Sequence, residues 1–96
     1  MSNSTSPDSG VIVTGGASGI GLASAEALAE VGRPVAIWDI NAERSATVAA
    51  DIAQRFGVAT VGVGVDLSQV GNIAPALQQT RAALPSIGGL VHAAGI

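Results

Sequence analysis

The chain of 96 residues has no cysteine, lysine or tyrosine, and only one tryptophan and one phenylalanine. Without cysteine it can form neither a disulfide nor a thiolate metal site, and we predict no metal centre. Charged residues make up only 11% of the chain, and its four cations are arginines dispersed along the sequence. Because nucleic-acid binding draws on clustered cations to neutralise phosphates, this distribution argues against a nucleic-acid partner.

Long apolar runs are also missing. No run approaches the roughly 20 residues that a membrane-spanning helix needs, so no membrane span is predicted. The N-terminal segment MSNSTSPDSG has neither a basic start nor an apolar core, which argues against a secretory signal. We therefore expect residues 1–10 to be a disordered leader, residues 11–96 to form one domain, and the protein to be cytoplasmic.

Segments with the period of a strand alternate with segments that have the period of a helix. Strands are predicted at 11–14 and 35–38 and within 59–66 and 88–95. Three helices are predicted between them. Their inward faces would be formed by Ile20, Ala23, Ala27, Leu28 and Val31, then Ser45, Val48, Ala49, Ile52 and Phe56, then Ile73, Leu77 and Leu84.

Start and stop residues support these three helices. Gly32 and Gly57 would end the first two, and Asn41 and Ser68 would cap the N-termini of the second and third. Pro75 must lie in the first turn of the third helix, where its missing N–H costs little.

The resulting order, β-α-β-α-β-α-β with short connections, predicts a Rossmann-type α/β fold. Right-handed crossovers then make a doubly wound parallel sheet in the strand order 3-2-1-4, with the fourth strand at an edge. The mean hydropathy of +0.51 is high for a free-standing soluble domain. The fourth strand would also leave an apolar sheet edge uncovered. From the high hydropathy and this edge we expect the chain to be the first, truncated half of a larger fold.

The stretch VIVTGGASGIG, residues 11–21, breaks from a buried strand into glycines and then opens a helix. Gly15 would let the strand turn sharply, Gly19 would let a pyrophosphate approach the backbone, and Gly21 would let helix and strand pack tightly. The helix N-terminus offers N–H groups to phosphates, so no lysine is needed. The missing lysine argues against the other common phosphate loop, which requires one.

Two carboxylates follow the next strands. Asp39, after the second strand, can accept hydrogen bonds from the ribose of an adenosine and would repel a 2′-phosphate, which favours NAD(H) over NADP(H). No cation at positions 17, 18, 40 or 41 would receive that phosphate. Asp66 either holds the adenine edge or belongs only to the turn before Ser68. Trp38 is interpreted as core in preference to a wall of the adenine pocket.

Together, TGGASGIG, Asp39, VDLS and HAAG resemble the N-terminal, cofactor-binding half of the short-chain dehydrogenase/reductase family. The resemblance implies a pyrophosphate and adjacent ribose near the glycine turn, an adenosine ribose at the second strand, adenine at the third, and a floor under the ribose at the fourth. In that order the implied cofactor-binding residues are Gly15, Ala17, Ser18, Gly19, Ile20 and Gly21; Asp39 and Ile40; Asp66 and Leu67; and His92, Ala93, Ala94 and Gly95.

The fourth strand departs from the family pattern. Family members commonly have Asn-Asn-Ala-Gly there, whereas this chain has His92 and Ala93 at the first two positions. His92 is the only histidine and has no nucleophile or carboxylate close in sequence, so it is interpreted as a strand-end residue satisfied by local hydrogen bonds.

The resemblance also implies a reaction. The family interconverts alcohols and ketones by hydride transfer and uses a Tyr-x-x-x-Lys motif, a serine and an asparagine that follow the fourth strand. No such set exists in this chain, so no catalytic residue is predicted and the chain alone is expected to be inactive. A full-length enzyme is expected to be a homo-oligomer acting on a small alcohol or ketone. The alternatives are a non-catalytic dinucleotide-binding sensor or scaffold and, less well supported, a methyltransferase-like nucleotide fold.

Overall fold

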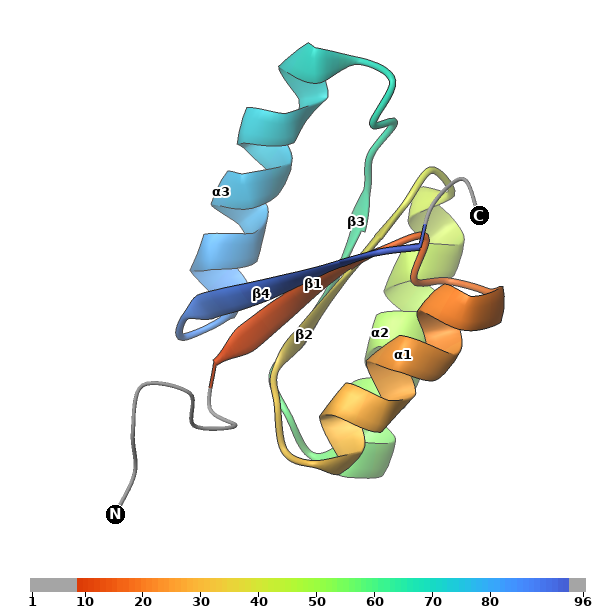
Figure 1. Cartoon of the computed structure of the whole chain (residues 1–96), viewed down its shortest axis with the longest axis vertical. Helices are drawn as coiled ribbons and strands as arrows, with labels where there is room; N and C mark the ends of the chain where they lie inside the picture. The colour runs from red at the N-terminus through yellow and green to blue at the C-terminus, as the bar shows by residue number, and fades with distance from the viewer. Residues whose placement is uncertain (1–8, 94–96) are drawn as a thin grey trace.

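The computed structural model describes residues 9–93, which form a four-stranded sheet with helices on both faces (Figure 1). In chain order the elements are β1 (Gly10–Thr14), α1 (Gly19–Glu30), β2 (Val35–Asp39), α2 (Ala42–Phe56), β3 (Thr60–Gly64), the 3-10 turn η1 (Val70–Asn72), α3 (Ile73–Ala83) and β4 (Ile87–His92). The strand order is β3-β2-β1-β4 and all pairs are parallel, which confirms the predicted doubly wound sheet.

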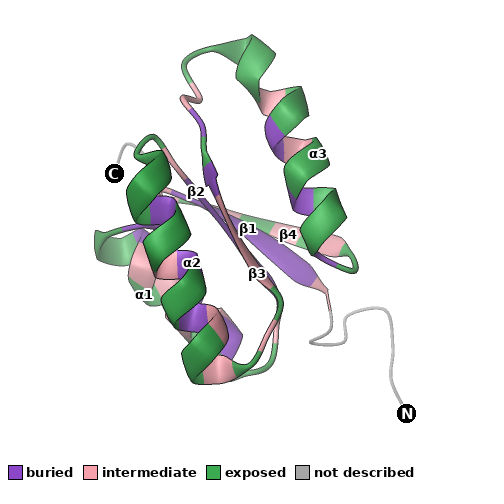
Figure 2. Cartoon of the chain, turned by 180° about the vertical axis from the view of Figure 1, so that it is seen from behind, coloured by how far each residue is buried: buried purple, intermediate pink, exposed green. Residues whose placement is uncertain are grey.

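The core lies on both sides of the two central strands. Helices α1 and α2 cover one face of the sheet and α3 covers the other (Figure 1). Val13 and Ile37 belong to the cluster under α1 and α2, whereas Ile12 and Trp38 belong to the cluster under α3. Seen from behind, the central strands are buried and the outer helix faces are exposed (Figure 2). Burial on both faces explains why β1 and β2 are continuous apolar runs.

The predicted inward face of α1 is wrong except at Leu28, which is partly buried against the core. The buried residues of this helix are Gly21, Ala25 and Ala29, whereas Ile20 and Val31 are more than 60% exposed. Small residues four positions apart let the helix backbone approach the sheet closely, and this close packing outweighs the burial of the larger side chains. Gly32, with φ of 89°, follows the end of the helix as expected.

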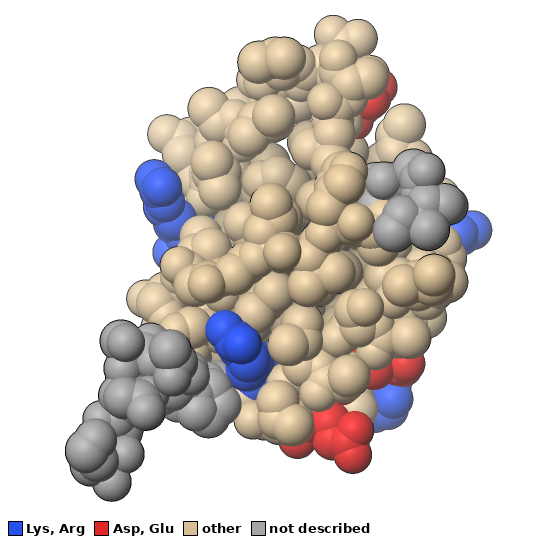
Figure 3. Space-filling view, viewed as in Figure 1, with Lys and Arg blue, Asp and Glu red and all other residues tan. Residues whose placement is uncertain are grey.

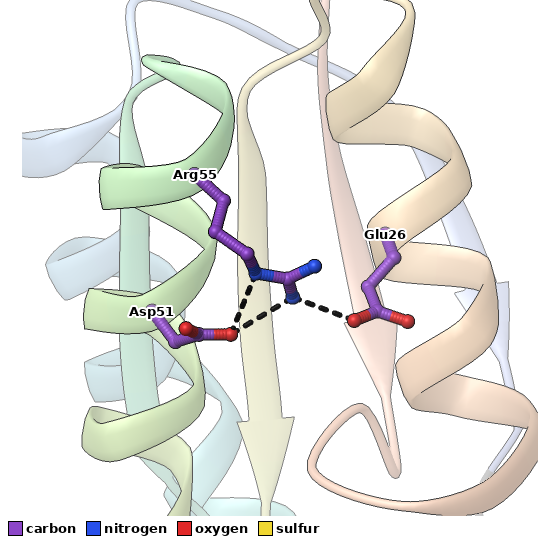
Figure 4. Close-up of polar contacts among 3 residues, drawn as sticks. All are labelled: Glu26, Asp51 and Arg55. Atoms are coloured by element: carbon purple, nitrogen blue, oxygen red, sulfur yellow. Dashed lines mark hydrogen bonds and ion pairs between the residues drawn. The ribbon is translucent and has the colours of Figure 1, made fainter.

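Helix α2 matches its prediction at both ends. The Asn41 side chain accepts a hydrogen bond from the Arg44 N–H at 2.9 Å, and Gly57 takes the left-handed conformation after the last turn. In its last turn, Arg55 donates to Asp51 on the same helix and to Glu26 on α1 (Figure 4). These two carboxylates raise the pKa of the Arg55 guanidinium, and the bridge links the outer faces of α1 and α2.

Helix α3 begins later than predicted. The Ser68 hydroxyl does not cap it, because a turn and η1 intervene and the helix starts at Ile73. Pro75 lies in the first turn, as predicted, and Ala76 and Thr80 form the buried face. Leu84 is buried just beyond the helix end.

The outer surface carries few charges and several large apolar side chains. The face shown in Figure 3 is mostly uncharged, with cations and carboxylates only at scattered places. Among the described residues, Ile40, Val70 and Leu90 are 72%, 81% and 64% exposed. No helix within residues 9–93 combines the length and the apolar character that crossing a membrane would require.

Candidate functional site

A cavity of about 610 Å³ opens where the carboxyl ends of the strands meet. It is lined by residues at the ends of all four strands or just after them, since each parallel strand ends at the same edge of the sheet. Ligands of open α/β sheets bind in this crevice. The lining residues are Gly15, Trp38, Asp39, Ile40, Val65, Asp66, Leu67, Ser68 and His92.

The glycine turn after β1 is built as its sequence predicts. Gly15 and Gly19 have φ of 68° and 61°, which side chains other than glycine rarely adopt. A Cβ on Gly21 would overlap the carbonyl of Gly15, so only glycine lets the start of α1 sit against the turn. The Gly15 N–H donates to the carbonyl of Trp38 at 2.7 Å, which joins the turn to the end of β2.

The N-terminus of α1 faces outward beside this turn. Ser18 is the N-cap residue, is exposed, and makes no side-chain capping bond. The first N–H to bond back within the helix is that of Leu22, which donates to the Ser18 carbonyl at 3.3 Å. A helix leaves its first N–H groups without intrahelical partners, and these groups together with the helix dipole attract anions.

Asp39 bridges the end of β2 to the glycine turn. Its Oδ2 accepts a hydrogen bond from the Ala17 N–H at 3.2 Å, and its Oδ1 accepts one from the Asn41 N–H at 3.1 Å. Two backbone donors therefore fix the orientation of the carboxylate at the cavity wall. Each carboxylate oxygen has a second lone pair that can accept a hydrogen bond from a ligand.

Asp66 lines the cavity and also closes a local turn. Its Oδ1 accepts hydrogen bonds from the Ser68 hydroxyl at 2.7 Å and from the Ser68 N–H at 3.0 Å. The hydroxyl bond, followed by the backbone bond, lowers the pKa of the Asp66 carboxyl. Both roles considered for this residue are thus structurally compatible, because the turn holds the carboxylate at the rim of the cavity.

At the other side of the cavity, His92 is paired with Thr14. The Nδ1 of His92 lies 2.9 Å from the Oγ1 of Thr14, and the Ala93 N–H donates to the Thr14 carbonyl at 3.1 Å. Thr14 is 3% exposed, whereas His92 is an exposed residue at the cavity. The His92 ring is therefore hydrogen-bonded at the strand end, as predicted, but its partner lies on the neighbouring strand β1, far away in sequence.

Trp38 is core, as predicted, and its edge also reaches the cavity. The side chain is 4% exposed, and its indole Nε1 donates to the Thr80 Oγ1 on α3 at 2.9 Å. The Thr80 hydroxyl in turn donates to the Ala76 carbonyl at 2.9 Å. This buried chain of bonds fixes the tryptophan between the sheet and α3.

The predicted site residues fall into three groups. Those that line the cavity are Gly15, Asp39, Ile40, Asp66, Leu67 and His92, and those that form the turn and helix start beside it are Ala17, Ser18, Gly19, Ile20 and Gly21. Ala93 directly follows β4, while Ala94 and Gly95 lie outside the described residues. Val65 and Ser68 also line the cavity and were not predicted to do so, although they flank Asp66 in sequence.

Comparisons with known proteins match nearly the whole chain. The family model described as short chain dehydrogenase matches residues 9–96. The chain is 41% identical over 85 residues to the Rhizobium meliloti protein named probable galactose dehydrogenase GalD, covering 88% of this chain and 33% of that one. It is 39% identical over 85 residues to a Sphingomonas 2-dehydro-3-deoxy-L-rhamnonate dehydrogenase (NAD(+)), covering 88% and 32%.

Solved structures share the fold. L-sorbose reductase from Gluconobacter frateurii, complexed with NADPH and L-sorbose, superposes with a TM-score of 0.85 at 28% identity, covering 93% of this chain and 34% of that one. The chain thus spans about a third of the length of the relatives it matches. With the family model matching nearly its whole length, the chain belongs to the short chain dehydrogenase family.

Proposed function

We propose that this chain binds NAD(H) for an enzyme that interconverts an alcohol and a ketone by hydride transfer. One observation carries the proposal: the cavity at the strand ends brings a glycine turn, a helix N-terminus and the Asp39 carboxylate to one place. A pyrophosphate needs the first two and an adenosine ribose needs the third.

The glycine turn fits a pyrophosphate. A Cβ built on Gly19 would have no atom within 4 Å, so the backbone at the start of α1 borders open space. The helix N-terminus supplies the favourable charge, which is consistent with a chain that contains no lysine.

Asp39 supports NAD(H) over NADP(H). Its carboxylate is held by the Ala17 and Asn41 N–H groups and can accept hydrogen bonds from the adenosine ribose hydroxyls. A 2′-phosphate in the same position would bring like charges together. Named relatives use either cofactor, since one carries NAD(+) in its name and the sorbose reductase is complexed with NADPH, so the preference rests on Asp39.

A bound NAD+ would supply the hydride acceptor for oxidation of an alcohol at its carbinol carbon, and a base would be needed to take the proton of the alcohol oxygen. The residues of this chain bind and orient the dinucleotide. The chain has no tyrosine and no lysine, so the pair that the family uses for proton transfer must come from outside these 96 residues. We expect the chain alone to bind weakly and to catalyse nothing.

The test uses the protein expressed from its complete reading frame. Calorimetric titration should show NADH binding more tightly than NADPH. NADH formation should be measured with NAD+ and galactose, the substrate that the name of one reported relative indicates. If neither NADH nor NADPH binds, the proposal is refuted. If a cofactor binds tightly without turnover and the reading frame lacks Tyr-x-x-x-Lys, a dinucleotide-binding sensor or scaffold is favoured.

A further inference from the structure

Trp38 joins α3 to the glycine turn by two sets of hydrogen bonds. Its indole Nε1 donates to the Thr80 Oγ1 at 2.9 Å, on the α3 face of the sheet. Its backbone carbonyl accepts the N–H groups of Gly15 at 2.7 Å and Gly16 at 3.3 Å. Trp38 also directly precedes Asp39, which ends β2. The position of the tryptophan therefore affects the turn and the cavity wall beside the carboxylate.

The groups in the side-chain bonds of Trp38 fix the direction of each bond. An indole N–H can only donate, so the Thr80 oxygen is its acceptor. The Thr80 hydroxyl gives its single proton to the Ala76 carbonyl at 2.9 Å, one turn earlier on α3. Trp38 is 4% exposed and Thr80 is 0% exposed. Removing the hydroxyl would therefore leave a buried donor without its acceptor, which is costly.

The indole forms part of the apolar wall of the cavity. Trp38 precedes Asp39 in sequence, and Val65 and Leu67 flank Asp66. The three apolar residues line the cavity and join the core cluster under α3. With NAD(H) bound as proposed, the adenosine ribose is at Asp39, so the adenine would lie against this apolar wall.

We propose that Thr80 is a positioning residue for the adenine end of the cofactor, because its hydroxyl holds the indole of Trp38 in the cavity wall. The inference rests on the proposed binding of NAD(H). Thr80 itself does not line the cavity. The indole lines this cavity and a second, apolar one of about 470 Å³ beside α3. Without Thr80 as acceptor, its N–H regains a partner by turning towards water in one of them, which displaces the wall.

The test compares Thr80→Val with Thr80→Ser in the full-length protein. Valine keeps the shape of threonine but has no acceptor, whereas serine keeps the hydroxyl. Calorimetric titration should show AMP and NADH, which share the adenosine, binding about fivefold more weakly to Thr80→Val, the value of one hydrogen bond. Thr80→Ser should restore most of that loss. The indole N–H resonance of Trp38, assigned by its loss in Trp38→Phe, should shift and exchange faster with solvent in Thr80→Val.

Ile52→Val is the matched control, because it trims a buried side chain under α1 and α2 and leaves the bond between Trp38 and Thr80 intact. It should lower the stability without changing the affinity for AMP or the indole resonance. The proposal is overturned if Thr80→Val binds AMP as tightly as the unaltered protein. It is also overturned if Ile52→Val weakens the binding of AMP by the same factor, which would indicate a general loss of stability.

The background Trp38→Phe provides a second test, because it removes the indole N–H and leaves no unpaired donor to destabilise the double variant. Thr80→Val should cause no further loss of AMP affinity there, and a further fivefold loss would show that Thr80 does not act through the indole. If the unaltered protein binds neither AMP nor NADH, the proposed function fails instead. An unshifted indole resonance in Thr80→Val would then overturn the positioning of Trp38 as well.

Discussion

The Oδ2 of Asp39 accepts a hydrogen bond from the N–H of Ala17 at 3.2 Å, which links the end of β2 to the glycine turn after β1. A second hydrogen bond joins the same turn to β2, because the Gly15 N–H donates to the Trp38 carbonyl at 2.7 Å. The carboxylate proposed to hold a ribose therefore also helps to shape the loop proposed to hold a pyrophosphate.

Replacing Asp39 with Ala should weaken the binding of NADH by about tenfold or more, because hydrogen bonds to a charged acceptor are among the stronger hydrogen bonds. The ratio of the affinities for NADH and NADPH should become smaller, since the substitution also removes the negative charge that would repel the 2′-phosphate of NADPH. Asp39→Asn keeps one acceptor oxygen for the Ala17 N–H but loses the charge, so it separates the two effects. Calorimetric titration with both cofactors measures them. Unchanged affinities in both variants would contradict the assignment of Asp39.

Gly21 and Gly71 should respond in opposite ways to alanine. A Cβ at Gly21 would overlap the Gly15 carbonyl, so Gly21→Ala should destabilise the protein by about 1–3 kcal/mol or more. At Gly71 a Cβ would meet nothing within 4 Å and φ is not positive. Gly71→Ala should be neutral or stabilise by up to about 1 kcal/mol. Thermal unfolding compares the two, and equal effects would show that the close packing at Gly21 is not needed.

Thr80→Val should cost about 1–3 kcal/mol of unfolding free energy, because it leaves the buried indole N–H of Trp38 without its acceptor. Thr47→Val is the control, since that hydroxyl is exposed and bonds only the Glu43 carbonyl of its own helix. Denaturant unfolding can be followed by the fluorescence of Trp38, the only tryptophan. A Thr80→Val variant as stable as the control would mean that water replaces the lost bond.

Asp66 gives a prediction for acid conditions. Its pKa is lowered by the two hydrogen bonds from Ser68, so folding favours the ionised form. That stabilisation is present above the ordinary aspartate pKa of about 3.9 and is lost as the pH falls through the lower folded value. Ser68→Ala should raise the pKa, as measured by NMR titration of the carboxyl carbon. Ser86→Ala, at an exposed serine before β4, should leave it unchanged; an equal rise in both variants would exclude the Ser68 bond as the cause.

Much of the fold and most of the site followed from local pattern. The apolar runs of β1 and β2, the Asn41 cap and the Gly57 stop each depend on a few neighbouring residues, and all are present in the structure. The face of α1 and the start of α3 were predicted wrongly. Both depend on what packs against the helix. On α1, small residues let the helix backbone approach the sheet closely, which the hydrophobicity of its side chains does not reveal.

By itself, the sequence determined the order of strands and helices and the residue types at the strand ends, because period, glycine spacing and capping are local properties. Only the tertiary structure decided which of these residues meet. The parallel sheet brings the ends of four strands to one edge, so Asp39 reaches Ala17 and His92 reaches Thr14 across long separations in the chain. Those contacts depend on crossovers and register, which no short stretch of sequence encodes.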